Sequence, residues 1–255
     1  MRRAPAGLLA SALLATTVAT TVVPSPAAAQ FPPERTTNLK VLPADIPVRA
    51  LIDTMARFTR ALGVRCTYCH VGREGEPLER YDFASDEKPE KLKAREMLRM
   101  TAAINGEHLA KLASRREPRV VVTCATCHRG VTEPRPLQQR LLTAYDAAGA
   151  DSAEALYRAL RQRYYGSAAY DFGEVPLADV AAAMRARGRL ADAVRFYLLN
   201  TGFSPTSGFA FRQAAEAQLA AGDTAGATAS LERALAINAN DQQARRALDG
   251  LRRRP

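Results

Sequence analysis

Two five-residue stretches combine two cysteines and a histidine at the same spacing, CTYCH at 66–70 and CATCH at 124–128, and they use all four cysteines of the chain. Two thiols three positions apart can add to the two vinyl groups of one haem, and the histidine that follows can ligate its iron. The repeated motif therefore predicts two haem c groups. Their attachment sites would be Cys66 with Cys69 and Cys124 with Cys127, and the proximal iron ligands would be His70 and His128.

Four cysteines are also compatible with other chemistry. Paired C-x-x-C units can hold a structural zinc ion, but both adjacent histidines would then be coincidences. A redox-active dithiol explains one C-x-x-C and not two. Disulfides within the two motifs would close very short loops and constrain little of the chain. Covalent haem is the interpretation that uses all six residues.

The sixth ligand decides whether a haem iron only transfers electrons or also binds small ligands. At the first motif the candidate is Met55, eleven residues before Cys66, on the apolar stripe of a helix expected from Ile46 to Leu62. Gly63 supplies a stop signal, after which the chain could double back and place Met55 opposite His70. On periodicity alone, however, Met55 is better explained as a core residue of that helix.

A second helix, expected from about Pro89 to about Ser114, carries the candidates for the second motif. Met97, Met100 and His108 fall on roughly one face of it. Methionine is favoured because the first motif offers a methionine in the same place, and His108 can equally be a surface or core histidine. Methionine–histidine ligation would raise the reduction potentials relative to bis-histidine ligation and favour simple electron transfer.

The N-terminus has the order of a secretory signal peptide. Arg2 and Arg3 precede an uncharged apolar run from Leu8 to Val23, and Ala27–Ala29 forms an A-x-A cleavage site. We expect cleavage after residue 29 and a periplasmic protein; an uncleaved N-terminal anchor is the alternative. No later stretch is apolar for long enough to span a bilayer.

The chain is basic, with a formal net charge of +10 that falls to +8 when the two arginines of residues 1–29 are removed. Export makes nucleic acid an unsuitable partner. Acidic redox proteins, or an anionic membrane surface with which the protein associates peripherally, fit this charge better. Haem propionates would offset part of the excess.

The rest of the chain is rich in alanine, leucine and arginine and contains a repeat. Gly188 and Gly222 lie 34 residues apart, and in the same register Ala193 matches Ala227. This is the period of the tetratricopeptide repeat, although an unrelated pair of alanine-rich hairpins is the alternative. A helix near 151–165 would cap the stack. The sequence therefore predicts a mainly α fold with little regular sheet: a signal peptide (1–29), a dihaem cytochrome c domain (30–140), a connecting helical segment (141–173) and tetratricopeptide-like repeats (174–255).

Residues 55–105, beginning MARFTRALGVRCTYCH, and the later VTCATCHRG resemble the cytochrome c subunit of photosynthetic reaction centres. In that family a helix with a methionine ligand precedes each C-x-x-C-H motif. The resemblance, which covers about residues 41–135, implies Met55 with His70 at the first haem. At the second it implies His128 with a methionine of the segment MLRMTAAIN, for which we take Met100, with Met97 as the alternative.

The chain departs from that family in two ways. The typical subunit binds four haems, and this sequence has two attachment motifs followed by helical repeats. One haem of the typical subunit takes a distant histidine, a role that His108 could retain. We therefore expect an electron carrier and not an enzyme, which donates electrons to a membrane reaction centre or serves a respiratory complex. A dihaem peroxidase-like enzyme is the alternative.

Overall fold

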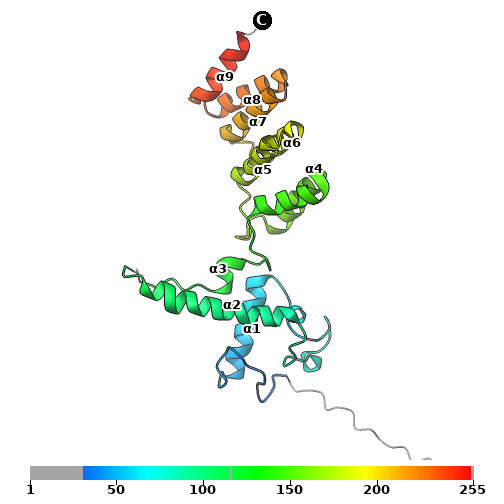
Figure 1. Ribbon diagram of the computed structural model, residues 1–255, viewed down its shortest axis with the longest axis vertical. Coiled ribbons are helices and arrows are strands. Elements are labelled where there is room, and N and C mark those ends of the chain that lie inside the picture. Colours follow the sequence, from blue (N-terminus) through cyan, green and yellow to red (C-terminus); the bar gives the residue numbers. More distant parts are fainter. Residues whose placement is uncertain (1–30, 115–116, 254–255) are drawn as a thin grey trace, which may run out of the picture.

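The computed structural model describes residues 31–114 and 117–253, so the expected signal peptide at 1–29 lies outside the described residues. The fold is mainly α, as predicted. Within the described ranges the extended pairing is limited to one isolated antiparallel bridge between Val71 and Asp82. Figure 1 shows a stack of helices that runs from α4 to α9, with α1, α2 and α3 at the opposite end of an elongated molecule.

The N-terminal part of the described chain, which contains the two motifs, forms seven helical segments. They are α1 (Val48–Leu62), η1 (Cys66–Tyr68), η2 (Leu78–Arg80), α2 (Pro89–Ala103), η3 (Ile104–His108), η4 (Leu109–Lys111) and α3 (Cys124–His128). The remainder of the chain forms α4 (Leu137–Tyr164), α5 (Glu174–Ala186), α6 (Leu190–Phe203), α7 (Gly208–Ala220), α8 (Thr224–Ile237) and α9 (Gln242–Arg252).

The 34-residue register appears in the structure as two equivalent helix pairs, α5–α6 and α7–α8. Gly188 and Gly222 both adopt positive φ, 74° and 84°, in the turns that join each pair. The matched Ala193 and Ala227 are both fully buried, as is expected where the two helices of a pair cross. Each pair packs on its neighbour in the chain, and α9 packs on α8. The C-terminal part is therefore a tetratricopeptide-like helical repeat domain.

Helix α4 caps the stack over a longer stretch than the sequence suggested. The expected helix at 151–165 is present, but it continues a helical segment that begins at Leu137, with a break at Ala148 and Gly149 where the backbone leaves the helical region. Leu137 and Leu141 are buried in one core cluster with α5 and α6. The domain boundary at residue 140 stays a prediction, although α4 shares its core with the repeats on both sides of it.

The part that carries the cysteine motifs buries almost no apolar side chains of its own. Of the described residues before Leu137, the buried hydrophobic ones are Ala61 and Val131, and Val131 belongs to the core cluster of the repeats. Helix α2 has no buried residue and α1 has one, although α1 carries the apolar stripe predicted from its sequence. These helices are held together by something other than a protein core.

Helix α2 ends earlier than predicted. The α-helical hydrogen bonds end at Ala103, and the chain continues as a π-helical turn from Ile104 to His108 and a 3₁₀ turn from Leu109 to Lys111. A π turn shifts the angular position of every later residue, so the α-helical spacing that put His108 on the face of Met100 does not hold. Local sequence signals do not reveal this change, because no proline or glycine lies between Pro89 and the π turn, and Gly106 lies within the turn itself.

Candidate haem-binding sites

Each cysteine motif forms a single helical turn. In the first, the backbone N–H of His70 donates to Cys66 O at 2.9 Å; in the second, residues Cys124–His128 form α3. Residues three apart on such a turn lie on the same side, so both thiols of each motif face one direction. This is the arrangement that two bonds to neighbouring positions of one rigid ring require.

The imidazole of His128 is fixed in one tautomer. Its Nδ1 lies 2.9 Å from the carbonyl oxygen of Val131. A carbonyl oxygen only accepts hydrogen bonds, so Nδ1 carries the proton and Nε2 keeps its lone pair for a metal. Such a bond from the second nitrogen to a backbone carbonyl is typical of histidines that ligate metals.

The imidazole of His70 is positioned by packing. Its ring meets Phe83 edge-on, with centroids 5.0 Å apart, and Phe83 in turn packs against Tyr81 and Phe31. Nδ1 of His70 is buried and makes no hydrogen bond with the described residues. Burial, and then the charge of Lys91, lower the pKa of His70, which favours the neutral ring that an iron ligand requires.

The loop that carries Phe83 is folded back onto the first motif. Asp82 N–H donates to Val71 O at 2.9 Å, and the Tyr81 hydroxyl donates to Arg73 O at 2.8 Å. A Cβ on Gly72 would lie 2.6 Å from the Tyr81 ring, so only glycine fits at position 72. These contacts close the loop and place Phe83 beside His70.

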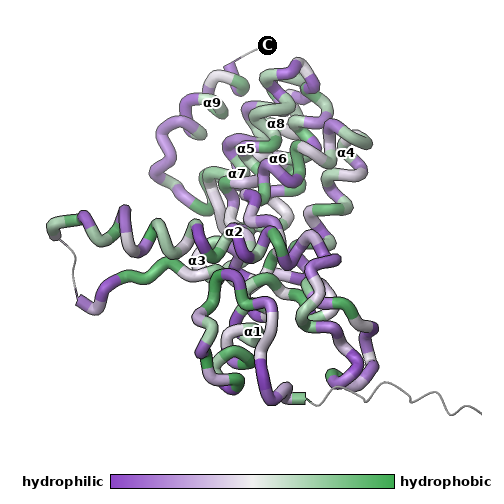
Figure 2. The backbone as a smooth tube through the Cα atoms, turned by 60° about the horizontal axis from the view of Figure 1, so that its bottom comes forward, coloured by the Kyte–Doolittle hydropathy of each residue, from purple (hydrophilic) through white to green (hydrophobic). Residues whose placement is uncertain are grey.

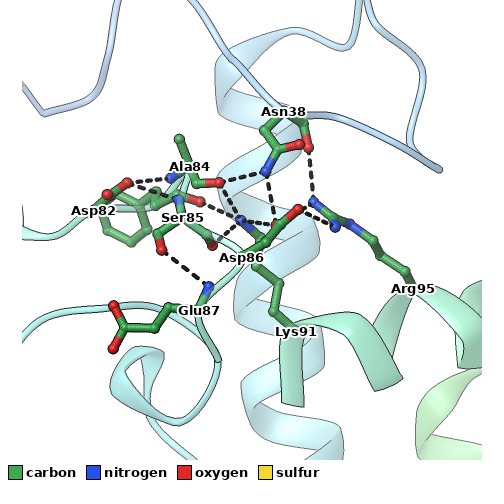
Figure 3. Close-up of polar contacts among 9 residues, drawn as sticks. Asn38, Asp82, Ala84, Ser85, Asp86, Glu87, Lys91 and Arg95 are labelled. Atoms are coloured by element: carbon green, nitrogen blue, oxygen red, sulfur yellow. Dashed lines mark hydrogen bonds and ion pairs between the residues drawn. The ribbon is translucent and has the colours of Figure 1, made fainter. Parts of the chain in front are cut away.

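A polar cluster fastens this loop to α2 and to the chain that leads into α1 (Figure 3). Lys91 Nζ donates to the carbonyl oxygens of Phe83, Ala84 and Ser85 at 3.0, 2.9 and 2.7 Å, and forms an ion pair with Asp86 at 3.2 Å. Three carbonyl oxygens match the three N–H donors of an ammonium group. The side chain of Lys91 is 13% exposed.

Asp86 is the acceptor at the centre of the same cluster. Arg95 pairs with it at 2.9 Å and also donates to Asn38 O, while the Asn38 amide donates to Asp86 at 2.8 Å. The hydrogen bond from Arg95, together with those from Lys91 and Asn38, holds the pKa of Asp86 well below its usual value. This cluster was not predicted from the sequence, where its only signal is a mixed run of charges at 86–95.

The second motif is positioned by Asn105. Its side-chain amide donates to Val122 O and accepts from Val122 N–H, each at 2.8 Å, so the end of α2 is tied to the segment that enters α3. Thr123 then caps α3 through a reciprocal capping box with Thr126. In Figure 2, α2 and this segment run side by side and project together from the rest of the molecule.

The two motifs are joined where α1 ends. Helix α1 packs against α3, and Gly130 N–H donates to Ala61 O at 2.8 Å. Gly63, the left-handed cap of α1 at φ 67°, approaches so closely that a Cβ there would lie 2.2 Å from Gly130 O. The turn after the second motif is thereby seated on the helix that leads into the first.

The methionine candidates lie on these two helices. Met55 is half-buried on α1, and Met97 and Met100 on α2 are 39% and 44% exposed. None of the three is packed into a protein core, so the core interpretation of Met55 gains no support. His108 is exposed on the π turn. The assignment of sixth ligands, Met55 and Met100 with Met97 or His108 as alternatives, stays a prediction.

The chemistry of these residues fits haem c better than zinc or disulfides. Burial raises the pKa of the Cys69 and Cys124 thiols. The two motifs do not come together as one metal site. The described residues contain no group of three or more His, Cys, Asp or Glu side chains that could hold a metal ion. Two thiols and an imidazole nitrogen at each site, together with the unburied apolar stripe of α1, suit a porphyrin.

Comparison with known families decides between these possibilities. The model of the family described as "Photosynthetic reaction centre cytochrome C subunit" matches residues 15–171, which is more than half of the chain. The chain belongs to this reaction-centre cytochrome family. The match includes both cysteine motifs, α1 and α2, and it ends between α4 and α5, so the helix pairs of the repeat domain lie outside it.

Individual relatives cover parts of this cytochrome. Cytochrome c-554 of Chloroflexus aurantiacus is 35% identical over 99 residues, which are 39% of this chain and 21% of that protein. The chain thus spans about a fifth of that relative. Two solved structures, the first TPR of Spaghetti (RPAP3) bound to an HSP90 peptide and PcrH from Pseudomonas aeruginosa, are 18% and 20% identical; each covers 46% of this chain, 87% and 89% of its own, with a TM-score of 0.32.

The close approach of α1 and the second motif predicts a strong effect of Gly63→Ala. The new Cβ must push the Gly130 carbonyl away, in addition to the left-handed strain of about 1 kcal/mol. Gly75→Ala is the matched control, since Gly75 has φ 86° and a Cβ added there would meet no atom within 4 Å. In urea unfolding followed by the Soret band, Gly63→Ala should cost about 1–3 kcal/mol more than Gly75→Ala. Equal costs would show that the approach is not tight.

The charge cluster predicts a pH-dependent stability. Because the pKa of Asp86 is lower in the folded protein than the value of about 3.9 in unfolded chains, its contribution is complete above that value and is lost as the pH falls below it. The urea midpoint of the wild type should therefore exceed that of Asp86→Asn by a constant amount from pH 7 to 5. The difference should shrink below about pH 4. A difference that persists unchanged at pH 2 would contradict this account.

Proposed function

We propose that this protein is an exported dihaem c-type cytochrome that carries electrons for a membrane-bound partner. Membership of the reaction-centre cytochrome family supports the electron-carrier role. Two C-x-x-C-H turns, each with its thiols on one side and its histidine free to ligate, support two haems. The observation that carries the proposal is the pairing of these turns with α1, whose apolar stripe is not buried by protein, and with α2, whose Met97 and Met100 are exposed.

The roles of individual residues follow from the two motifs and from the family resemblance. Cys66 with Cys69 and Cys124 with Cys127 would hold the two haems covalently, and His70 and His128 would ligate the irons. We propose Met55 as the sixth ligand at the first site and Met100 at the second. When bound, haem supplies a one-electron couple whose potential the axial ligands and their surroundings set.

The protein's own part is to orient these groups and limit water. The Val131 carbonyl holds the tautomer of His128, and Phe83 holds the plane of His70. Asn105 and the capping box of Thr123 keep the second turn in register with α2. Outer-sphere electron transfer makes or breaks no bond and moves no proton. The main requirement on the protein is therefore that the iron ligands stay rigid.

We further propose that the protein acts in the periplasm. The N-terminal segment predicts export, and the described residues contain no helix long and apolar enough to cross a membrane. The family supports a redox partner such as a reaction centre, and a respiratory complex is the alternative. The basic charge of the chain suits an acidic docking surface or peripheral contact with an anionic membrane. The helical repeats would provide a docking surface.

The first test counts the haems and probes their ligands in protein matured in the periplasm. A pyridine haemochrome assay should give two haems per chain. Met55→His and Met100→His should each weaken the red sulfur-to-iron absorption of the oxidised protein, because each replaces one thioether ligand. Met97→His is the matched control, since Met97 is similarly exposed on the same helix and should leave the band unchanged.

The outcomes separate the parts of this proposal. A count below two would reject the dihaem cytochrome. If Met97→His removed the band and Met100→His did not, the second ligand would be Met97. A five-coordinate iron that binds peroxide in the wild type would favour the peroxidase-like alternative.

A further inference from the structure

We propose that Lys91 is a fixed positive charge that raises the reduction potential of the first haem. This inference rests on the proposed function, because it concerns the haem attached at Cys66 and Cys69. It assigns a role to a residue that is neither an attachment site nor an iron ligand. Its basis is that one residue, Phe83, separates the poorly exposed ammonium group of Lys91 from the His70 ring.

The path from Lys91 to His70 is short. Nζ of Lys91 donates to the backbone carbonyl of Phe83 at 3.0 Å, and the ring of the same Phe83 lies 5.0 Å from the imidazole of His70, centroid to centroid. Figure 3 shows the ammonium group enclosed by the loop at 83–86.

The position of the charge is fixed by its bonds. With three carbonyl oxygens and Asp86 around it, the ammonium group has no N–H donor left without an acceptor. A side chain that is 13% exposed is also screened less by water and salt than one on the surface. The charge therefore stays in place in both redox states of the haem.

Anions nearby reduce this effect and do not cancel it. Asp82 and Asp86 face the same loop, and Glu90 lies near Cys69. Asp82 is exposed and the Asp86 side chain is 39% exposed, whereas the side chains of Lys91 and Arg95 are each 13% exposed. Solvent thus screens Asp82 and Asp86 more than it screens Lys91 and Arg95.

The residues described around the second site provide no equivalent charge. The cation next to His128 is Arg129, which is exposed and donates to Thr126 O at 3.3 Å. Water screens a charge at such a position strongly. The two haems therefore differ in their electrostatic surroundings even though their motifs are alike.

The physical consequence has a definite sign. Oxidised haem carries one more positive charge than reduced haem, so a nearby cation destabilises the oxidised form and raises the potential. Removal of Lys91 should lower the potential of one haem, and removal of the Asp86 carboxylate should raise the potential of that same haem. A merely structural role predicts something else, since loosening the loop by either change would move the potential in one direction.

The test is a potentiometric titration of the full matured protein, followed at the α-band and fitted as two one-electron waves. Lys91→Gln should shift one wave to lower potential. At a fixed potential the ratio of reduced to oxidised haem at that site should fall by about three- to tenfold, which corresponds to at most ~59 mV for one electron. Asp86→Asn should shift the same wave upward. Lys91→Arg keeps the charge and should leave that wave near its wild-type position.

Lys93→Gln is the matched control, because Lys93 is an exposed lysine on the same helix and should move neither wave. An unshifted wave in Lys91→Gln, equal shifts of both waves, or shifts of the same sign in Lys91→Gln and Asp86→Asn would each overturn the inference. If Lys91→Gln does not fold, Asp86→Asn still tests the sign, because an unmoved or lowered wave in that variant would overturn the inference. A haem count of two with unmoved potentials rejects this inference alone, whereas a lower count rejects the proposed function.

Discussion

The structure of this cytochrome depends on apolar surface that the protein does not bury by itself. Helices α1 and α2 have 15 residues each, and between them they bury one alanine. One buried alanine is far too little apolar burial to offset the conformational entropy lost when two such helices are ordered. In a cytochrome of this family, covalently attached haem would supply the missing core, and attachment ensures that it is present whenever the chain folds.

The two haem units are interlocked rather than serial. Helix α1 leads into the first motif, yet its end packs on α3 through Gly63 and Gly130. Helix α2 begins at the loop of the first motif, where Lys88 donates to Thr67 O, and its end is tied through Asn105 to the segment before the second. Each unit is thus positioned by elements that also serve the other. This arrangement keeps the two proposed iron sites at a constant separation, as transfer between them would require.

Some of this could be predicted from the sequence and some could not. The cysteine motifs, α1 with its Gly63 cap and the 34-residue register follow from local patterns with a fixed chemical or steric cause. The π turn after Ala103 and the cluster of Asn38, Asp86, Lys91 and Arg95 do not, because they depend on which distant segments meet. Asn38 and Asp86 are 48 residues apart, and the sequence around either residue does not predict their contact. Sixth ligands are equally non-local, so spacing alone left Met100, Met97 and His108 open.

The most direct test of the central claim is amide hydrogen exchange on the matured protein and on a variant with all four cysteines changed to serine. If haem is the core of the N-terminal part, amides of α1 and α2 should lose most of their protection in the variant. Those of α5 to α8, which have their own core, should keep it. Unchanged protection of α1 and α2 without attached haem would contradict this account.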